Sequence, residues 1–156
     1  MAQTSSVEPL KVERVLKATR EKVFKAFTSE QELREWYIPC EAGFKLSVYE
    51  VNAKVGGKYR IEILSPEKRK DVLSGVYEEV KAPERIVYSM VLKEGRVARK
   101  GDTPMSKTRV CVSLKDLGAK TEVVITQEPF PMDKAKESQE KGWKALLDKL
   151  AKHLGS

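Results

Sequence analysis

Hydrophobic residues in the last part of the chain, from Asp133 to Leu154, recur at steps of three and four positions. This spacing is typical of an amphipathic helix with one apolar stripe, whose members are Trp143, Leu146, Leu147, Leu150, Ala151 and Leu154. Gly142 lies inside this predicted helix, where a glycine costs about 1 kcal/mol relative to alanine. Two reasons for it remain open: close approach of another element, or space left for a bound molecule.

The earlier part of the chain mostly alternates between apolar and polar residues, the period expected of strands. A first strand is predicted at Val12–Ala18, and six more at Phe44–Val51, Lys58–Leu64, Val72–Val80, Arg85–Leu92, Thr108–Leu114 and Thr121–Glu128. Short turns join several of them and predict antiparallel pairing with one buried face. The inward residues are Tyr59, Ile61 and Ile63, then Ile86, Tyr88 and Met90, then Val110, Val112 and Leu114, and finally Val123, Ile125 and Gln127.

Two short helices are expected between the first two strands. Thr19 can cap a helix that begins near Arg20, and Ser29 can cap a second one, with Glu32 completing a capping box. The buried face of the second helix would hold Leu33, Trp36 and Tyr37, and Pro39 would end it. This order predicts a single α+β domain over residues 11–154, with a curved antiparallel sheet around the last helix and a frayed N-terminus at 1–10.

Composition indicates an ordinary globular protein, with 40% hydrophobic and 34% charged residues in a chain of 156. No apolar run approaches the roughly 18 residues of a membrane span, and residues 1–6 lack the features of a secretory signal. Cys40 and Cys111 have no partners at metal-ligand spacing, so we expect two free thiols in a reducing compartment, with the cytoplasm as the default.

The net charge of +7 permits attraction to nucleic acid, to an anionic membrane or to an acidic protein, without indicating any of them. Unbalanced basic residues are densest in one loop, at Arg96, Arg99, Lys100 and Lys107. This loop is either a solvated hairpin connection or a docking surface. Nucleic-acid binding would call for exposed aromatic residues among these bases, and the loop lacks them. We therefore expect no nucleic-acid partner.

Catalytic and metal-binding patterns are also missing from the sequence. His153 is the single histidine, and its place in the last helical turn suits it to complement the helix C-terminus. Gly56-Gly57 lacks the further glycines and the following helix of a nucleotide-binding loop. Glu78 and Glu79 are strand neighbours that point to opposite faces. We expect no metal, no cofactor and no enzymatic activity.

The chain resembles one known family over nearly its whole length, from Val12 to Leu154. The marks follow one another in order: Arg14, residues 18–27, Leu33 with 36–39, the double glycine of 55–59, residues 75–80 and 83–88, Thr121-Glu122-Val123, and Gly142-Trp143. In this order they are similar to the activator of heat-shock-protein-90 ATPase homologue family, within the START-like superfamily. The chain departs from that pattern at Tyr37, where the family often has a second tryptophan, and at Asn52-Ala53-Lys54, which replaces Asp-x-Arg.

The resemblance implies a helix-grip fold, like that of the birch-pollen allergen, with an apolar cavity between the sheet and the last helix. Relatives use this cavity for hydrophobic small molecules or lipid-like compounds. The residues expected to line it are Tyr59, Ile61, Tyr88, Met90, Val112, Gln127, Gln139, Gly142, Trp143 and Leu146. The amides of Gln127 and Gln139 either orient a ligand together with Tyr59 and Tyr88, or bind one another, backbone or water in a packed core. Trp143 and Trp36 fit a core better than an aromatic cage.

Two other functions stay open. The family name implies a co-chaperone-like module acting on a heat-shock-protein-90 type ATPase, although the known activators carry an additional N-terminal domain. Some superfamily members act as cyclases or dehydratases, which requires acid–base side chains in the cavity, whereas only tyrosines and amides can be placed there. The sequence therefore favours a binding protein without covalent chemistry.

Overall fold

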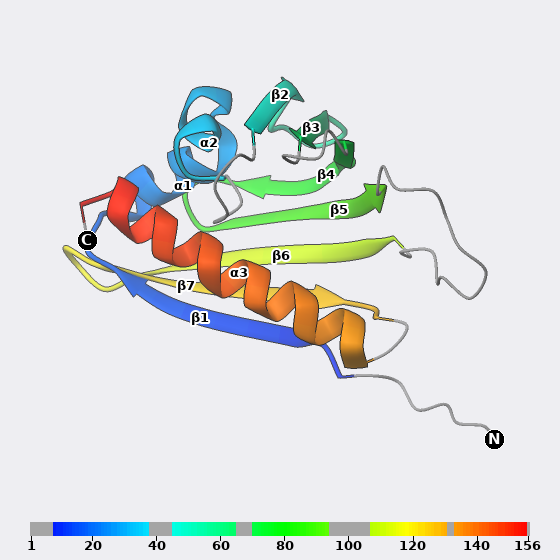
Figure 1. The fold of residues 1–156 in the computed structure, drawn as a ribbon. Helices are drawn as coiled ribbons and strands as arrows, with labels where there is room; N and C mark the ends of the chain where they lie inside the picture. Colours follow the sequence, from blue (N-terminus) through cyan, green and yellow to red (C-terminus); the bar gives the residue numbers. More distant parts are fainter. Residues whose placement is uncertain (1–7, 38–44, 65–69, 94–106, 131–132, 156) are drawn as a thin grey trace.

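The structure is a computed structural model that describes residues 8–37, 45–64, 70–93, 107–130 and 133–155, apart from the side chains at 46–49, 92–93, 134–135 and 138. Three helices and seven strands are present in this part of the chain (Figure 1). In chain order they are β1 (Leu10–Leu16), α1 (Arg20–Thr28), α2 (Glu30–Trp36), β2 (Lys45–Val51), β3 (Lys58–Leu64), β4 (Lys70–Lys81), β5 (Arg85–Lys93), β6 (Thr108–Asp116), β7 (Thr121–Glu128) and α3 (Asp133–His153).

The seven strands form one sheet in the order β1-β7-β6-β5-β4-β3-β2, and all neighbouring strands are antiparallel. This confirms the predicted α+β architecture, including the two short helices after the first strand. The boundaries differ slightly from the predicted ones. β1 begins at Leu10, whose side chain is completely buried, and β4 runs from Lys70 to Lys81.

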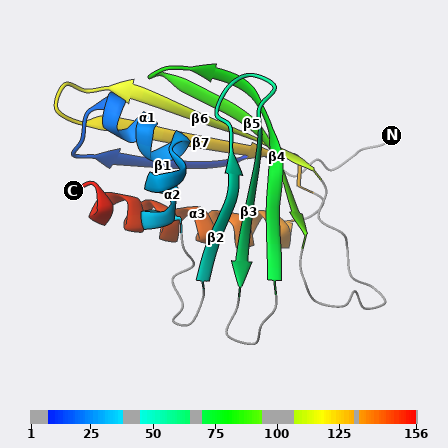
Figure 2. The same ribbon diagram turned by 90° about the horizontal axis from the view of Figure 1, so that it is seen from above.

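The sheet curves around α3, which accounts for the position of the candidate site. Register shifts occur between Val48 and Glu50 in β2 and between Tyr77 and Glu79 in β4, where irregular pairing lets a strand bend. Figure 1 shows α3 lying along β1, β7 and β6, with β2, β3 and β4 above it. Figure 2, turned by 90°, shows β2, β3 and β4 running across the direction of α3. The sheet therefore faces α3 from two sides.

The caps of α1 and α2 lie where the sequence places them. The side chain of Thr19 accepts a hydrogen bond from the Lys22 backbone N–H, and that of Ser29 accepts one from the backbone N–H of Glu32. The side chain of Glu32, however, is hydrogen-bonded to His153 on α3 and does not complete the expected capping box. This carboxylate therefore joins α2 to α3 and does not cap its own helix.

A continuous core lies between α3 and the inner face of the sheet. α3 contributes a buried stripe that matches the predicted periodicity, and the predicted inward residues of β6 and β7 are buried opposite it. Trp36 is fully buried, and its indole N–H donates to the Ala26 carbonyl over 2.9 Å, which fixes α2 against α1. The stripe and its partners are Trp143, Leu147, Leu150 and Ala151, with Val110, Val112, Leu114, Val123 and Ile125.

Several expectations fall on residues outside the described ones, namely Pro39, Cys40, Arg96, Arg99 and Lys100. Lys107, at the end of the predicted basic loop, is exposed, and Cys111 is a half-buried free thiol. None of the helices in the described ranges has the length and apolarity needed to cross a bilayer.

Candidate ligand-binding site

The ten residues predicted to line a site separate into two groups. Six are buried in the core and four are not. The buried six are Tyr59, Ile61, Met90, Val112, Gln127 and Trp143, whereas Tyr88, Gln139 and Leu146 are half-buried and Gly142 is exposed. The second group is thus the part of the predicted site that stays at least partly exposed.

The Gln127 amide is fully committed within the core. Its carbonyl oxygen accepts the indole N–H of Trp143 over 2.9 Å, and its nitrogen donates to the Thr108 hydroxyl over 2.9 Å, with the Met90 sulfur at 3.5 Å. A buried amide without such partners would cost about 1–3 kcal/mol. Gln127 is thus a satisfied part of a packed core. Its partners are the side chains of Trp143 and Thr108, and not the Gln139 amide, backbone or water named in the sequence analysis.

Tyr59 is likewise held by the protein itself. Its ring passes Gly75 of β4, and its hydroxyl donates to the Ser89 carbonyl oxygen of β5 over 2.7 Å. The ladder between β4 and β5 has no pairs between Ser74↔Val91 and Tyr77↔Tyr88, and the Ser89 hydroxyl takes up the Val76 N–H over 2.9 Å. Tyr59 and Ser89 thus satisfy backbone groups that the interrupted ladder leaves free.

Four tyrosines from three strands and the end of α2 gather on the inner side of the sheet. The rings of Tyr59, Tyr77 and Tyr88 have centroids 5.4–6.0 Å apart, in edge-on and tilted arrangements. Tyr37 follows α2 directly. If its phenol were ionised, the negative charge would raise the pKa values of Tyr59 and Tyr88. We call Tyr37, Tyr59, Tyr77 and Tyr88 the tyrosine cluster. Tyr37 and Tyr77 were not among the predicted site residues.

Burial keeps the cluster protonated. Loss of hydration raises the pKa of Tyr77 to about 12. The pKa values of Tyr37, Tyr59 and Tyr88 are also raised, first by burial and then by repulsion from the neighbouring phenol groups. At neutral pH all four hydroxyls are therefore uncharged donors. Among the described residues, Tyr59 is the member of the cluster whose hydroxyl has a hydrogen-bond partner, and those of Tyr37, Tyr77 and Tyr88 have none.

The two flanks of α3 face different parts of the molecule. Asp148 is hydrogen-bonded and ion-paired to Arg14 of β1, so one flank faces the first strand. His153 lies 2.8 Å from Glu32, so the other flank faces α2. Gly142 and Leu146 precede His153 by eleven and seven residues, which places all three within about 40° of one line along the helix. They belong to the flank that faces α2.

The environment of Gly142 decides between the two reasons offered for it. A Cβ atom added at this position would meet nothing within 4 Å among the described residues. Close approach of another element is therefore wrong as an explanation. Leu146, one turn further along the same flank, is only half-buried although it packs against the core. The α2-facing flank of α3 is thus partly apolar and partly uncovered.

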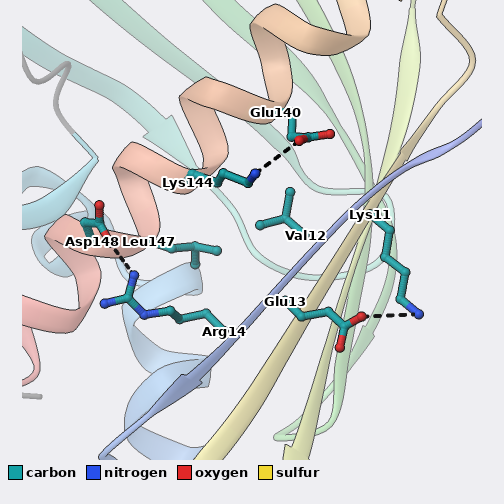
Figure 3. Close-up of a pocket in the computed structure, with 8 residues that line it drawn as sticks. All are labelled: Lys11, Val12, Glu13, Arg14, Glu140, Lys144, Leu147 and Asp148. Carbon is teal, nitrogen blue, oxygen red and sulfur yellow. Dashed lines mark hydrogen bonds and ion pairs between the residues drawn. The ribbon is translucent and has the colours of Figure 1, made fainter.

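A groove of about 420 Å³ lies on the opposite flank of α3, against β1 (Figure 3). It is lined by Lys11, Val12, Glu13, Arg14, Glu140, Lys144, Leu147 and Asp148. Its three cations each face a carboxylate: Lys11 pairs with Glu13 at 3.5 Å, Lys144 with Glu140 at 3.1 Å, and Arg14 with Asp148. Its charges are therefore balanced within the groove, which gives it no evident means of selecting a ligand.

Metal chemistry has no visible basis in the described part of the chain, where no group of three or more His, Cys, Asp or Glu side chains is placed to hold an ion. His153 lies in the last turn of α3, as predicted, but its ring is engaged by Glu32. Glu78 and Glu79 are paired separately, with Arg109 at 2.6 Å and with Arg85 at 3.2 Å. These groups serve the fold.

The sequence matches the family described as "Activator of Hsp90 ATPase homolog 1-like protein" over residues 17–155. The chain belongs to this family. Among solved structures it is similar to a protein from Chromobacterium violaceum, with 29% identity, a TM-score of 0.80, and coverage of 95% of this chain and 97% of that one. A Staphylococcus epidermidis protein has 25% identity, a TM-score of 0.76, and coverage of 99% and 94%.

A third structure, of an AHSA1 protein from Silicibacter pomeroyi, has 18% identity and a TM-score of 0.77, with coverage of 95% of this chain and 98% of that one. At this identity it supports the fold alone. The search of curated proteins gave no match. Together these findings confirm the predicted family and its START-like helix-grip fold.

Proposed function

We propose that this protein binds a hydrophobic small molecule or a lipid-like compound, without covalent chemistry, between the inner face of β3, β4 and β5 and the α2-facing flank of α3. The observation that carries the proposal is that this flank is apolar and only partly covered. Gly142 has open space above its Cα, and Leu146 stays half-buried although leucines prefer full burial. An apolar ligand would bury this surface and gain about 25 cal/mol per Å² covered.

The side chains around this surface favour binding over catalysis. General acid–base catalysis works best with a group whose pKa is near the working pH. The cluster instead offers phenols whose pKa values are raised, and the Gln127 amide is already occupied by core partners. These groups can orient a ligand, but they are poorly suited to moving a proton at neutral pH. We place this role in the cytoplasm.

A fluorescence titration with Nile red, an uncharged dye that brightens in apolar surroundings, tests the proposal. We expect saturable binding at one site. The Gly142→Trp variant fills the open side of α3 and should weaken binding at least tenfold. Lys144→Trp places the same ring on the β1-facing flank and is the matched control, expected to bind as the wild type does. Equal effects of the two variants, or no saturable binding, would contradict the proposal.

The family description favours a second candidate function, that of a co-chaperone-like module acting on an Hsp90-type ATPase. The net charge of +7 suits an acidic surface on such a partner. The test is the ATPase rate of a purified Hsp90-type chaperone with and without this protein, at low and at moderate salt. Stimulation that weakens with salt would support this role, and an unchanged rate at both salt concentrations would exclude it.

A further inference from the structure

We propose that two copies of this chain associate through the free edge of β1, in an antiparallel pairing centred on Val12 that joins their sheets into one. This association is separate from ligand binding beside α3 and does not require it. Three features of the molecule favour it: the two edges of the sheet are built differently, the exposed charges of β1 complement themselves in one register, and that register covers an exposed apolar side chain.

The two edges of the sheet differ in their regularity and in their cover. β2, at one edge, has a register shift between Val48 and Glu50, and α2 packs against this strand. Bulges and covering helices are two of the means by which proteins keep edge strands from pairing with other chains. β1, at the other edge, pairs with β7 over all seven of its residues, Leu10–Leu16, without a shift. Its other side therefore presents a regular row of backbone groups that none of the described strands pairs with.

Charged side chains are a further means of protecting an edge, and those of β1 are arranged to admit one kind of partner. Lys11 and Glu13 are exposed and lie two residues apart, so both point away from the face that buries Val12. Their charged groups are 3.5 Å apart within the one strand (Figure 3), where an exposed ion pair contributes little stability. An incoming antiparallel strand with the same two residues would add two cross-strand ion pairs.

The register of such a self-pairing follows from these charges. Directly opposite residues of antiparallel strands share a face, so a symmetric pairing must place one residue opposite its own copy. A pairing centred on Lys11, Glu13 or Arg14 would oppose like charges. Centres nearer the ends of β1 would leave most of the strand unpaired. A pairing centred on Val12 instead places Lys11 of each chain opposite Glu13 of the other.

The same register covers an exposed apolar side chain. Val15 is 48% exposed and lies on the same face of β1 as Lys11 and Glu13. Its opposite residue in the pairing is Pro9 of the second copy, which is also exposed. Proline has no N–H to donate, and the end of a paired segment is a position where a strand tolerates it. Contact between Val15 and Pro9 removes apolar surface from water at both ends of the pairing.

The inner face of β1 accommodates the second copy without breaking a contact. In the proposed register Leu10 of each chain lies opposite Arg14 of the other. Arg14 keeps its ion pair with Asp148 on α3, and the aliphatic part of its side chain can cover apolar surface. The association therefore adds contacts to those that β1 already makes.

Sedimentation velocity over a range of protein concentrations tests the association. The mass of the wild type should approach twice the 17.6 kDa of the single chain as concentration rises, and added salt should shift it back. Lys11→Glu opposes glutamates across the pairing and Glu13→Lys opposes lysines, so each variant alone should associate at least tenfold more weakly. Lys22→Glu is the matched control. It makes the same change of charge at an exposed position of α1, which packs against α2 and β6, and should associate as the wild type does.

An equimolar mixture of the two β1 variants tests the register itself. Lys11→Glu leaves two acidic residues on the outer face of β1 and Glu13→Lys leaves two basic ones, so the mixture should form a one-to-one complex although neither variant associates alone. Circular dichroism melting checks that each variant is folded. A wild type that stays monomeric at every concentration, association that is equal in all variants, or a mixture that forms no complex would overturn the inference.

Discussion

Gly75 offers the sharpest test of how the sheet is built around the tyrosine cluster. A Cβ atom at this position would lie 1.9 Å from the Ser89 carbonyl oxygen, 2.7 Å from the carbonyl carbon and 2.8 Å from Cε1 of Tyr59. Two of these three atoms are backbone and cannot turn aside. In the Gly75→Ala variant β4 and β5 must separate, and the hydrogen bond from Tyr59 to Ser89 is lost with that movement.

The cost can be worked from these contacts. Forcing a methyl group into a packed site costs about 1–3 kcal/mol, and loss of the hydrogen bond adds about 1 kcal/mol. We therefore expect Gly75→Ala to lower the free energy of unfolding by about 3 kcal/mol, which for a domain of this size lowers the melting temperature by roughly 6–12 °C. Urea titration followed by circular dichroism measures the change.

The matched control is the same substitution at Gly142, where the added methyl group meets nothing within 4 Å. Alanine is the better helix former, so Gly142→Ala should raise the free energy of unfolding by about 0.5–1 kcal/mol. The two glycines thus give opposite signs for one chemical change. A Gly75→Ala variant within 0.5 kcal/mol of the wild type would refute the reasoning, as would rescue by Tyr59→Leu, because the contact with the Ser89 backbone remains in the double variant.

Three further predictions follow from the contacts described above. Tyr59→Phe should cost about 1 kcal/mol in urea titrations through its lost bond to Ser89, whereas Tyr77→Phe should stay within 0.5 kcal/mol because its hydroxyl has no partner among the described residues. Equal losses of unfolding free energy in the two variants would contradict this assignment of the hydrogen bond. A double-mutant cycle on Glu32 and His153, both partly buried, should give an interaction free energy of about 0.5–1 kcal/mol between α2 and α3. An interaction free energy of zero would show that the contact does not stabilise the fold. Tyrosine ionisation should reduce stability at alkaline pH: the unfolded phenol titrates near 10.0 and that of folded Tyr77 near 12, so the folded state holds a proton that the unfolded state releases, and stability falls as pH rises from 10 through 12. Full phenolate absorbance near pH 10 in a protein that is still folded would exclude this.

The fold could be predicted from the sequence because each element carries its own local signal. The alternation in β6 and β7 identified Val112 and Gln127 as inward, and the stripe of α3 identified Trp143 as core. These signals depend on the period of the chain and not on contacts between distant residues. The same holds for the caps Thr19 and Ser29.

The site could be predicted only in part, because its geometry depends on contacts between distant residues. Tyr77 has the inward parity of β4, but a register shift follows it directly, and alternation is an unreliable guide beside a bulge. The bond from Trp143 to Gln127 requires a particular rotation of α3, which no local pattern sets. The spacing placed Gly142 inside the predicted helix, yet only the assembled structure shows that this position is exposed.

The most direct test of the central claim is an NMR titration of protein carrying ¹³C in its tyrosine rings, with Nile red as the ligand. If the ligand binds between the inner sheet face and the α2-facing flank of α3, the ring signals of Tyr77 and Tyr88 should shift together and saturate. The Gly142→Trp variant should abolish these shifts, and Lys144→Trp should preserve them. Ring signals that stay unchanged while backbone shifts gather around Arg14 and Lys144, in the groove beside β1, would contradict the account.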